Sequence, residues 1–243
     1  ELRHPKYACD VIAMGTNTDP YQPVERGLNI TRRILEVLAA FNHPVGIVTK
    51  SALVVRDLDI LAPMAAKGLA QVCVSVTTLD RDLARKLEPR AATPTRRIAT
   101  IRELAKAGVP TGVMAAPMIP AINDGELEAI LEEAREAGAS LAGYILLRVP
   151  LEIKDLFCEW LETHAPNRTN RVLGLLRETH GGQLYESTFG KRMRGSGAYA
   201  KLLERRFAVA VKRLGLNERR FALDRSQFRV PPTTGTQLSL FQL

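Results

Sequence analysis

The sequence has few cysteines and no long apolar run. Its 243 residues contain no stretch of about 18 consecutive apolar residues, which predicts that no transmembrane helix is present. A positively charged start followed by a short apolar stretch is also missing, so no secretory signal is visible. The three cysteines, Cys9, Cys73 and Cys158, are too few and too scattered for a disulfide framework. Together these absences predict a protein of the reducing cytoplasm.

Several familiar catalytic motifs are also absent. The sequence contains no G-x-x-x-x-G-K-S/T phosphate loop, no G-x-G-x-x-G after a strand and no G-x-S-x-G nucleophile elbow. It has no C-x-x-C pair. The four histidines have no metal-ligand spacing, and we expect each of them at the surface: His4, His43, His164 and His180.

The positive charge is concentrated in the last third of the chain, and the net charge is +8. Residues 1–164 carry 19 lysines and arginines against 21 acidic residues, whereas residues 165–243 carry 15 against 5. A solvated surface would explain any single charge run, but this asymmetry favours an anionic partner, with nucleic acid as the first candidate. The residues that we expect to contact it are Arg192, Arg194, Lys201, Arg205 and Arg206.

Short apolar runs alternate with helical patterns in the first 150 residues. The runs predict strands at 10–14, 44–49, 71–76, 110–115 and 143–147. The helices between them are expected at 31–41, 58–67, 94–107 and 124–137. This alternation predicts βαβ units and a parallel sheet in an α/β fold. Five units are too few for a closed eight-stranded barrel, so a partial (β/α) barrel or an open doubly wound sheet remains.

Only helices are expected after residue 150, at 151–163, 167–179 and 198–214. A basic, glycine-rich loop separates the last two of them. A Pro-Pro-Thr-Thr-Gly-Thr stretch near the end has the composition of a linker. We therefore divide the chain into a barrel core at 1–150, a basic helical extension packed on it at 151–220, and a flexible tail at 221–243.

Polar residues gather where the predicted strands end. Parallel strands present their carboxyl ends at one rim, and α/β enzymes place their sites there. Hydroxyl, amide, carboxylate and basic side chains follow the strands at this rim, whereas the opposite ends carry no such set. We therefore expect a functional site at the carboxyl rim, although each residue taken alone could serve only as a cap or a turn.

The motifs along this rim resemble those of a known family. They are MGTNTDPYQP at 14–23, VTK at 48–50, SVTT at 75–78, EPR at 88–90 and APMIP at 116–120. The same motifs occur in this order in radical S-adenosylmethionine (radical SAM) enzymes, above all in the group related to spore photoproduct lyase that is often labelled DNA repair photolyase. The resemblance covers residues 7–215, and it is specific only for the motifs taken together.

This resemblance implies a partial six-stranded (β/α) barrel, of which five strands are present and the first is expected to be missing. In the family, the loop after that strand carries a C-x3-C-x2-C motif that holds a 4Fe–4S cluster. Cys9, Cys73 and Cys158 do not have this spacing. We therefore expect the cluster ligands upstream of Glu1, no metal ligand in this chain, and no activity from this chain alone.

The resemblance also assigns the rim residues to S-adenosylmethionine. Lys50 would meet the carboxylate of the cofactor, where a positive charge suits it. Arg90 would fix the helix after the third strand or contact the carboxylate. The residues implied at the methionine and ribose are Thr16, Asn17, Thr18 and Asp19. Ser75 and Thr77 would hydrogen-bond the ribose hydroxyls or the carboxylate, and Ala116 and Pro117 would shape the adenine pocket.

Tyr144 and Arg148 are the candidates for the substrate side of the implied site. In the family, the reduced cluster cleaves S-adenosylmethionine to a 5′-deoxyadenosyl radical, which abstracts a hydrogen atom from the substrate. The electrons would come from a donor such as flavodoxin or ferredoxin. We therefore expect a radical lyase or oxidoreductase that acts on nucleic acid in DNA repair.

QLSLF near the C-terminus resembles the pentapeptide by which bacterial DNA polymerases and repair proteins dock on the sliding clamp. Gln237 would supply a polar contact, and the apolar anchors would be Leu238, Leu240 and Phe241. The alternative is a terminal segment that packs back on the domain.

Two other functions remain open from the sequence. The first is a non-catalytic nucleic-acid-binding barrel that docks on the clamp through its tail. The second is a lyase that uses Lys50 as a Schiff-base nucleophile, although nothing else in the sequence argues for an unprotonated lysine.

Overall fold

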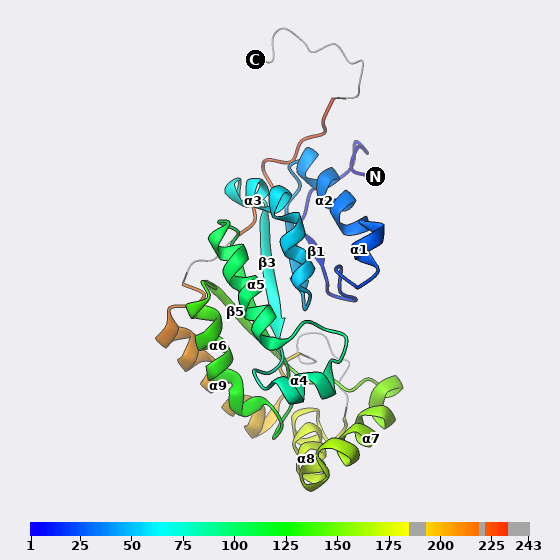
Figure 1. Cartoon of the computed structure of the whole chain (residues 1–243), viewed down its shortest axis with the longest axis vertical. Coiled ribbons are helices and arrows are strands. Elements are labelled where there is room, and N and C mark those ends of the chain that lie inside the picture. Colours follow the sequence, from blue (N-terminus) through cyan, green and yellow to red (C-terminus); the bar gives the residue numbers. More distant parts are fainter. Residues whose placement is uncertain (185–192, 219–221, 233–243) are drawn as a thin grey trace.

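The computed structural model describes residues 1–184, 193–218 and 222–232. It contains five strands in one sheet, in the order β1-β2-β3-β4-β5, and every neighbouring pair is parallel (Figure 1). The strands are β1 (Ile12–Met14), β2 (Val45–Thr49), β3 (Ala70–Val76), β4 (Thr111–Met118) and β5 (Leu141–Leu146). The α/β fold with five parallel strands is thus confirmed.

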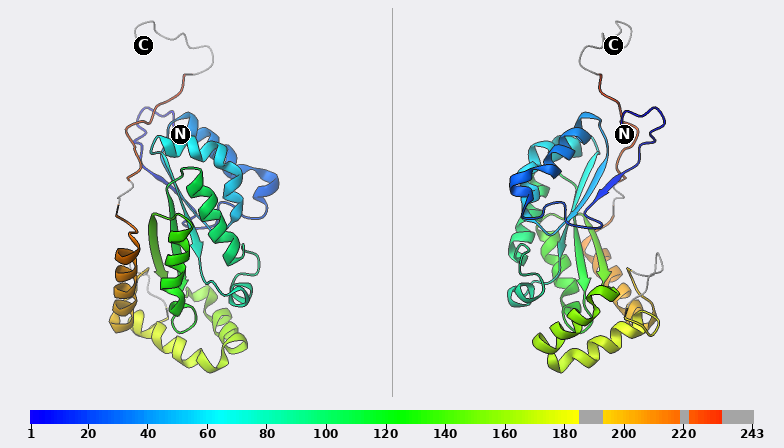
Figure 2. Two further views of the ribbon diagram at one scale, coloured as in Figure 1. Left: turned by 60° about the vertical axis from the view of Figure 1, so that its left-hand side comes forward. Right: turned by 90° about the vertical axis from the view of Figure 1, so that its right-hand side faces the viewer.

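Strand order distinguishes the two architectures that the sequence left open. A doubly wound sheet reverses its strand order at a switch point and carries helices on both faces. Here each strand pairs with the next one in the chain, and the intervening helices lie on one side of the sheet (Figure 2). These helices are α2 (Ile30–Ala40), α3 (Leu58–Ala66), α5 (Pro94–Lys106) and α6 (Leu127–Glu136). The sheet therefore forms the wall of a partial (β/α) barrel.

The remaining helices are short or follow β5. They are α1 (Glu25–Leu28), α4 (Arg81–Leu87), α7 (Lys154–His164), α8 (Thr169–Thr179) and α9 (Gly197–Leu214), with 3-10 turns η1 (Ala52–Asp57), η2 (Asp124–Glu126), η3 (Leu151–Ile153) and η4 (Pro166–Arg168). The helices predicted after residue 150 are confirmed, whereas α4 was not expected. Asp80 begins α4, because its side chain accepts hydrogen bonds from the backbone N–H groups of Asp82 (2.7 Å) and Leu83 (3.1 Å).

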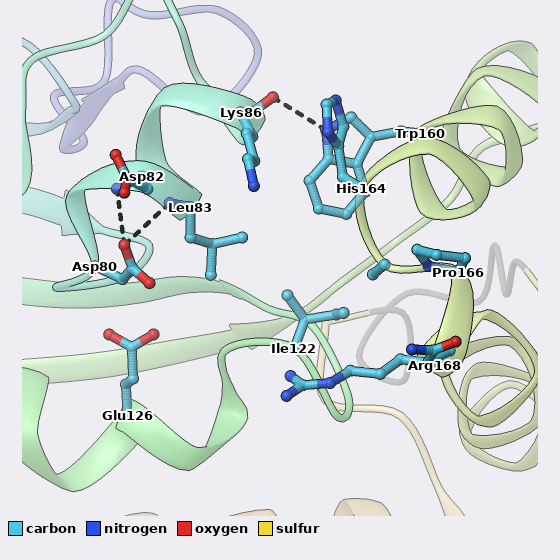
Figure 3. A pocket seen from close by; sticks show the side chains of 12 residues that line it. Asp80, Asp82, Leu83, Lys86, Ile122, Glu126, Trp160, His164, Pro166 and Arg168 are labelled. Atoms are coloured by element: carbon cyan, nitrogen blue, oxygen red, sulfur yellow. Dashed lines mark hydrogen bonds between the residues drawn. The ribbon is translucent and has the colours of Figure 1, made fainter.

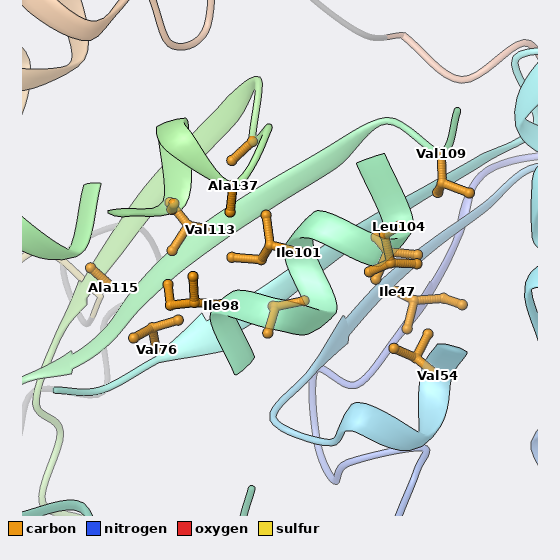
Figure 4. Close-up of a cluster of buried hydrophobic side chains, with 14 of the residues drawn as sticks. Ile47, Val54, Val76, Ile98, Ile101, Leu104, Val109, Val113, Ala115 and Ala137 are labelled. Atoms are coloured by element: carbon orange, nitrogen blue, oxygen red, sulfur yellow. The ribbon is translucent and has the colours of Figure 1, made fainter. Parts of the chain in front are cut away.

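Alternate strand residues face the helices and form the main core. Buried strand residues of this core include Val45, Ile47, Val72, Val74, Val76, Val113 and Ala115. They form one buried cluster with an apolar stripe of α5, which consists of Ile98, Ile101 and Leu104 (Figure 4). Burying such side chains contributes about 1.5–3 kcal/mol each before the entropy cost, so this layer holds the strands in register.

The other face of the sheet carries small residues. Gly46, Gly112 and Gly143 alternate with the core positions of β2, β4 and β5. A Cβ atom at Gly112 would approach the Cys73 sulfur to 2.8 Å, and one at Gly143 would approach the Met114 sulfur to 2.9 Å. Neighbouring side chains therefore fill the space above these two glycines, and they form part of the inner wall of the partial barrel.

The two edges of the sheet differ. At β5, the Asn217 side chain accepts from the N–H of Ala142 (2.8 Å) and donates to its carbonyl (2.9 Å), and so replaces a neighbouring strand. In the part of the chain that the structure describes, no strand pairs with the outer edge of β1. Beside this edge, α2 exposes an apolar stripe of Ile30, Ile34 and Val37.

The helices after β5 form a second core at the carboxyl end of the sheet. Its buried residues are Ile119, Val149, Leu161, Val172, Leu176 and Leu184. α9 then packs along α6, where Arg206 binds both carboxylate oxygens of Glu128 at 2.8 and 2.6 Å. The helical extension is thereby joined to the barrel at two places.

The segment 222–232 crosses the amino-terminal ends of the strands. The backbone N–H of Asp224 donates to the Gly68 carbonyl (2.9 Å). The Phe228 ring packs against the rings of Tyr7, Phe41 and His43, with centroids 5.4 to 6.2 Å apart. The structure therefore differs from the flexible tail expected over 221–243, because an aromatic anchor holds the first part of it.

Two histidines that were expected at the surface are buried. His43 is fully buried, with its Nε2 at 2.7 Å from the Tyr7 hydroxyl and its Nδ1 at 3.1 Å from the Pro44 carbonyl. His180 is also buried, and its Nδ1 lies 2.8 Å from the Leu176 carbonyl. The prediction was wrong for both, because the fold encloses each ring and gives at least one of its nitrogens a protein partner.

We expect Phe228→Ala to lower the free energy of unfolding by about 1–3 kcal/mol, because three ring contacts are lost with the side chain. Urea unfolding followed by circular dichroism measures this loss, and hydrogen exchange at the Asp224 amide should become faster. Val230→Ala is the control, because Val230 is 48% exposed and its truncation should cost less than about 0.5 kcal/mol. Equal losses in the two variants would contradict the anchoring role of Phe228.

Candidate functional site

The carboxylate of Glu88 connects three elements at the carboxyl rim of the sheet. It binds Lys50 Nζ after β2, the Thr77 hydroxyl after β3 (2.9 Å) and the Arg97 guanidinium of α5 (2.6 Å). The Glu88 side chain is 13% exposed. Burial raises the pKa of this carboxyl, but the charges and hydrogen bonds of Arg97 and Lys50 outweigh burial and hold the pKa below its usual range. Glu88 is therefore ionised at neutral pH and holds Lys50 in place.

Arg97 was missed by the sequence analysis. Its guanidinium is buried and also donates to the carbonyls of Ser75 (3.1 Å) and Ala92 (2.8 Å). The role of fixing the helix after β3, expected for Arg90, thus belongs to Arg97, whereas Arg90 is exposed. One signal was available, because Arg97 lies on the same face of the predicted helix as Ile101.

Asp19 closes the loop after β1 onto β2. Its carboxylate accepts hydrogen bonds from the Thr49 hydroxyl (2.7 Å) and from the backbone N–H groups of Lys50 and Tyr21 (both 2.8 Å). With three donors already bound, Asp19 positions the Lys50 backbone. The residues before it, Thr16, Asn17 and Thr18, are exposed at the rim.

A buried ionic cluster holds this loop from the side of the helices. The carboxylate of Asp57 is fully buried and binds Arg56 (2.8 and 2.9 Å), Arg32 (3.1 Å) and the Tyr21 hydroxyl (3.1 Å). Burial and the negative charge of Asp57 raise the pKa of Tyr21, so its hydroxyl stays protonated and donates. The path of the loop after β1 is therefore set by η1 and α2.

Asn123 is a second residue that the sequence analysis missed. Its buried side-chain amide donates to the carbonyls of Thr77 (2.6 Å) and Pro117 (2.9 Å), and its oxygen accepts from the N–H of Ile119 (2.6 Å). The Thr77 hydroxyl lies 3.0 Å from the Ala116 carbonyl. The structure thereby brings Thr77, Ala116 and Pro117 together, as the resemblance implied.

A cleft of about 720 Å³ opens beside Lys50. Its walls are the loop after β1, the beginning of η1 and the loop before α5. Among the expected cofactor-binding residues, Asp19, Lys50 and Arg90 line this cleft. Ser75 and Ala116 instead alternate with the core positions on β3 and β4, on the inner wall. Lys50, with a 35% exposed side chain, is available to bind an anion at this rim.

The contacts of Lys50 bear on the Schiff-base hypothesis. A lysine nucleophile attacks as the neutral amine, a form that an apolar pocket or a neighbouring cation favours. The Lys50 nitrogen instead donates to the Glu88 carboxylate. The structure therefore offers no support for Lys50 as a nucleophile.

The two residues expected on the substrate side, Tyr144 and Arg148, have different surroundings. Tyr144 is buried and packs against Phe207 of α9, with ring centroids 4.9 Å apart. It pairs in register with the helix-facing Ala115, so its side chain points toward the helices. This corrects the expected placement of Tyr144, because strand alternation directs it away from the inner wall. Arg148 follows β5 and lies 3.8 Å from the Met193 sulfur.

The basic residues expected to contact nucleic acid differ in their surroundings. Arg206 is bound to Glu128, and Arg194 pairs with Glu204 at 3.4 Å. Lys201 and Arg205 are exposed on α9. Arg192 lies outside the described residues, and so do the expected clamp-binding residues Gln237, Leu238, Leu240 and Phe241.

A second pocket, of about 390 Å³, lies between α4, α7 and η4 (Figure 3). Acidic residues lie on one side of it and Trp160 and His164 on the other. Glu126 binds the Thr78 hydroxyl (2.6 Å), and the Trp160 indole donates to the Lys86 carbonyl (3.0 Å). These groups hold the helices to the sheet, so we assign no ligand to this pocket.

The cysteines do not fit an iron–sulfur cluster. Cys9 precedes β1, Cys73 lies in β3, and Cys158 lies in α7. Burial raises the pKa of Cys73 to about 11, which disfavours the thiolate that iron requires. Within the described ranges, no group of three or more His, Cys, Asp or Glu residues is placed to hold a metal ion. None of the described helices is long and apolar enough to cross a membrane.

Comparison with known proteins gives a family and a set of relatives. The family model of the radical SAM superfamily matches residues 1–134. An uncharacterised protein of Mycobacterium tuberculosis is 35% identical over 179 residues, which are 73% of this chain and 53% of that protein. One of Methanocaldococcus jannaschii is 28% identical over 121 residues, covering 50% of this chain and 45% of that protein. The chain thus spans about half the length of the curated relatives it matches.

Solved structures of spore photoproduct lyase variants have a similar fold. One has a TM-score of 0.61 at 18% identity and covers 87% of this chain and 61% of that chain. Another, with a bound dinucleoside spore photoproduct, has a TM-score of 0.58 at 18% identity and covers 86% and 61%. At this identity the likeness shows a shared fold.

We expect Glu88→Gln to lower the free energy of unfolding at pH 7 by about 1–3 kcal/mol, because the buried Arg97 loses its compensating charge. Since the folded pKa of Glu88 is lowered, its contribution is fully present above the ordinary value of 4.5 and is lost as the pH falls through the lower folded pKa. Urea unfolding should therefore show the difference from wild type shrinking below pH 4.5.

The control for this prediction is Glu103→Gln, which removes the exposed partner of Arg96 and should cost less than about 1 kcal/mol. A wild-type to Glu88→Gln difference that stays constant as the solution is acidified would contradict the ionised state of Glu88.

Proposed function

The chain belongs to the radical SAM superfamily, and from that premise we propose that its carboxyl rim holds S-adenosylmethionine for a radical reaction. The observation that carries the proposal is Lys50, a partly exposed cation placed at the rim between the inner wall and the cleft. When bound, this cofactor supplies a 5′-deoxyadenosyl radical that removes a hydrogen atom from a substrate.

The described residues fit this cofactor in defined ways. Lys50 would bind its carboxylate, and Glu88 would keep the ammonium group at the rim. Ser75 in β3 and Thr77 directly after it would face the ribose, and Ala116 with Pro117 would shape the adenine side. The exposed Thr16, Asn17 and Thr18 remain proposed neighbours of the methionine.

The iron–sulfur cluster is proposed to lie on residues outside this chain. The described cysteines are dispersed, and the relatives are about twice as long as the matched region. The outer edge of β1 and the exposed apolar stripe of α2 would be covered by one more strand and helix. An electron donor such as flavodoxin or ferredoxin would then be needed, and this chain alone would be inactive.

We also propose that the substrate is a nucleic acid and that the reaction serves DNA repair. It is supported by the basic last third of the chain and by exposed Lys201 and Arg205 on α9. It is also supported by the fold shared with spore photoproduct lyase, one variant of which is solved with a bound dinucleoside spore photoproduct. The second candidate is a non-catalytic barrel that binds nucleic acid and docks on the sliding clamp.

We expect the coding sequence before Glu1 to contain a C-x3-C-x2-C motif. The protein expressed with that segment and reconstituted anaerobically should contain iron and sulfide and should release 5′-deoxyadenosine from S-adenosylmethionine. A gene that begins near Glu1 without the motif, or a colourless reconstituted protein, would contradict radical chemistry and favour the non-catalytic alternative.

Lys50→Met in the same protein separates cofactor binding from cluster assembly. It should weaken S-adenosylmethionine binding about 10- to 100-fold, as expected from the loss of one charge-assisted hydrogen bond, and leave the iron content unchanged. Lys67→Met is the matched control, because Lys67 follows α3 at the opposite end of the sheet and contacts Asn42 (3.2 Å). Equal affinities of the two variants for S-adenosylmethionine would show that Lys50 does not bind the cofactor.

The clamp interaction is a separate proposal that rests on the QLSLF sequence. We expect Leu240→Ala combined with Phe241→Ala to abolish retention of the protein on immobilised bacterial sliding clamp, because both apolar anchors are lost. Ser239→Ala is the control and should be retained as wild type is. Absence of clamp binding by the wild-type tail would reject the proposal.

A further inference from the structure

Cations surround the cleft beside Lys50. Arg26 in α1, Arg90 in the loop before α5 and Arg96 in the first turn of α5 line it together with Lys50. These four side chains come from two helices and two loops. We propose that this cleft binds the phosphate groups of a single-stranded nucleic acid, with Arg26 and Arg90 as the contacting residues.

The carboxylates around the cleft leave these two arginines without a partner. Asp19 is the one acidic residue lining it, and its oxygens already accept three hydrogen bonds. Glu88 is bound to Lys50, and Glu103 is bound to Arg96 at 2.8 Å. Within the described residues, neither Arg26 nor Arg90 makes an ion pair, and both are exposed. Their charge is therefore available to an external anion.

The chemistry of the cleft matches a phosphodiester backbone. Exposed arginines bind phosphate through paired N–H groups while keeping part of their hydration, and such contacts dominate nucleic-acid affinity. The lining also offers neutral hydrogen-bonding groups, Gln22, Ser51 and Thr93. Its volume of about 720 Å³ lies within the range of about 300–1,000 Å³ typical of ligand sites.

The position of the cleft connects it to the proposed reaction. Lys50 lies at its inner side, so a strand held by Arg26 and Arg90 would pass next to the cofactor-binding rim. This second step rests on the proposed function, whereas nucleic-acid binding itself does not. The contacts would also differ from those expected on α9, where Arg206 and Arg194 are already paired with carboxylates.

The experiment measures binding of a fluorescein-labelled 20-nucleotide single strand by anisotropy, without cofactor, over a range of salt concentrations. Arg26→Ala with Arg90→Ala should weaken binding about 5- to 30-fold at low salt, the loss expected for two exposed ion pairs. The slope of log affinity against log salt should fall by about 1.4, because each phosphate contact contributes about 0.7 on single strands. Arg26→Lys with Arg90→Lys should retain the wild-type slope.

The matched control is Arg81→Ala with Arg102→Ala, which removes the same charge from exposed positions on α4 and α5 outside the cleft. It should change the slope by less than half as much. Equal effects of the two double variants would show that binding depends only on net charge, and would overturn the proposal. An unchanged affinity of the Arg26→Ala, Arg90→Ala variant would also overturn it. Failure of S-adenosylmethionine binding would leave this measurement unaffected, so the two proposals are separable.

Discussion

The largely buried carboxylate of Glu88 makes the interactions on which the rim depends. It joins the end of β2 through Lys50, the end of β3 through Thr77, and α5 through Arg97. A buried carboxylate is costly unless cations and donors surround it, and here two cations and a hydroxyl do so. Because Glu88 follows α4, that short helix is also fixed relative to the sheet. One side chain thereby fixes the ends of two strands and one helix relative to each other at the candidate site.

The same rim is held from two further sides by groups that bind only protein. Asp19 draws the loop after β1 onto β2, and Asn123 draws the loop after β4 onto β3. The polar atoms of both side chains are hydrogen-bonded to backbone or hydroxyl groups, so both residues position the loops at the rim. Lys50 differs, because its ammonium has one carboxylate partner and stays partly exposed. A rim with several rigid supports and an accessible lysine is a preorganised place to bind an anionic group.

Three residues show why the sequence analysis and the structure differ in detail. Tyr144 belongs to a predicted strand, but the register with Ala115 turns its ring toward α9. Arg206 belongs to a basic run, but packing of α9 on α6 gives it Glu128 as a partner. As a charged residue, Arg97 is expected in solvent from composition alone, but it lies on the buried apolar face of α5. In each case a contact between residues far apart in the sequence decided the role.

The sequence by itself determined the alternation of strands and helices, the parallel sheet and the rim where polar residues gather. Those features follow from local periodicity and from the geometry of βαβ units, which act over short stretches of chain. The motif resemblance implied the partial barrel, whereas only the tertiary structure decided that Phe228 anchors the segment after α9 and that Glu88 and Arg97 hold Lys50 at the rim. Those features depend on which side chains meet across the fold, because burial and charge pairing are set by neighbours that local sequence does not specify.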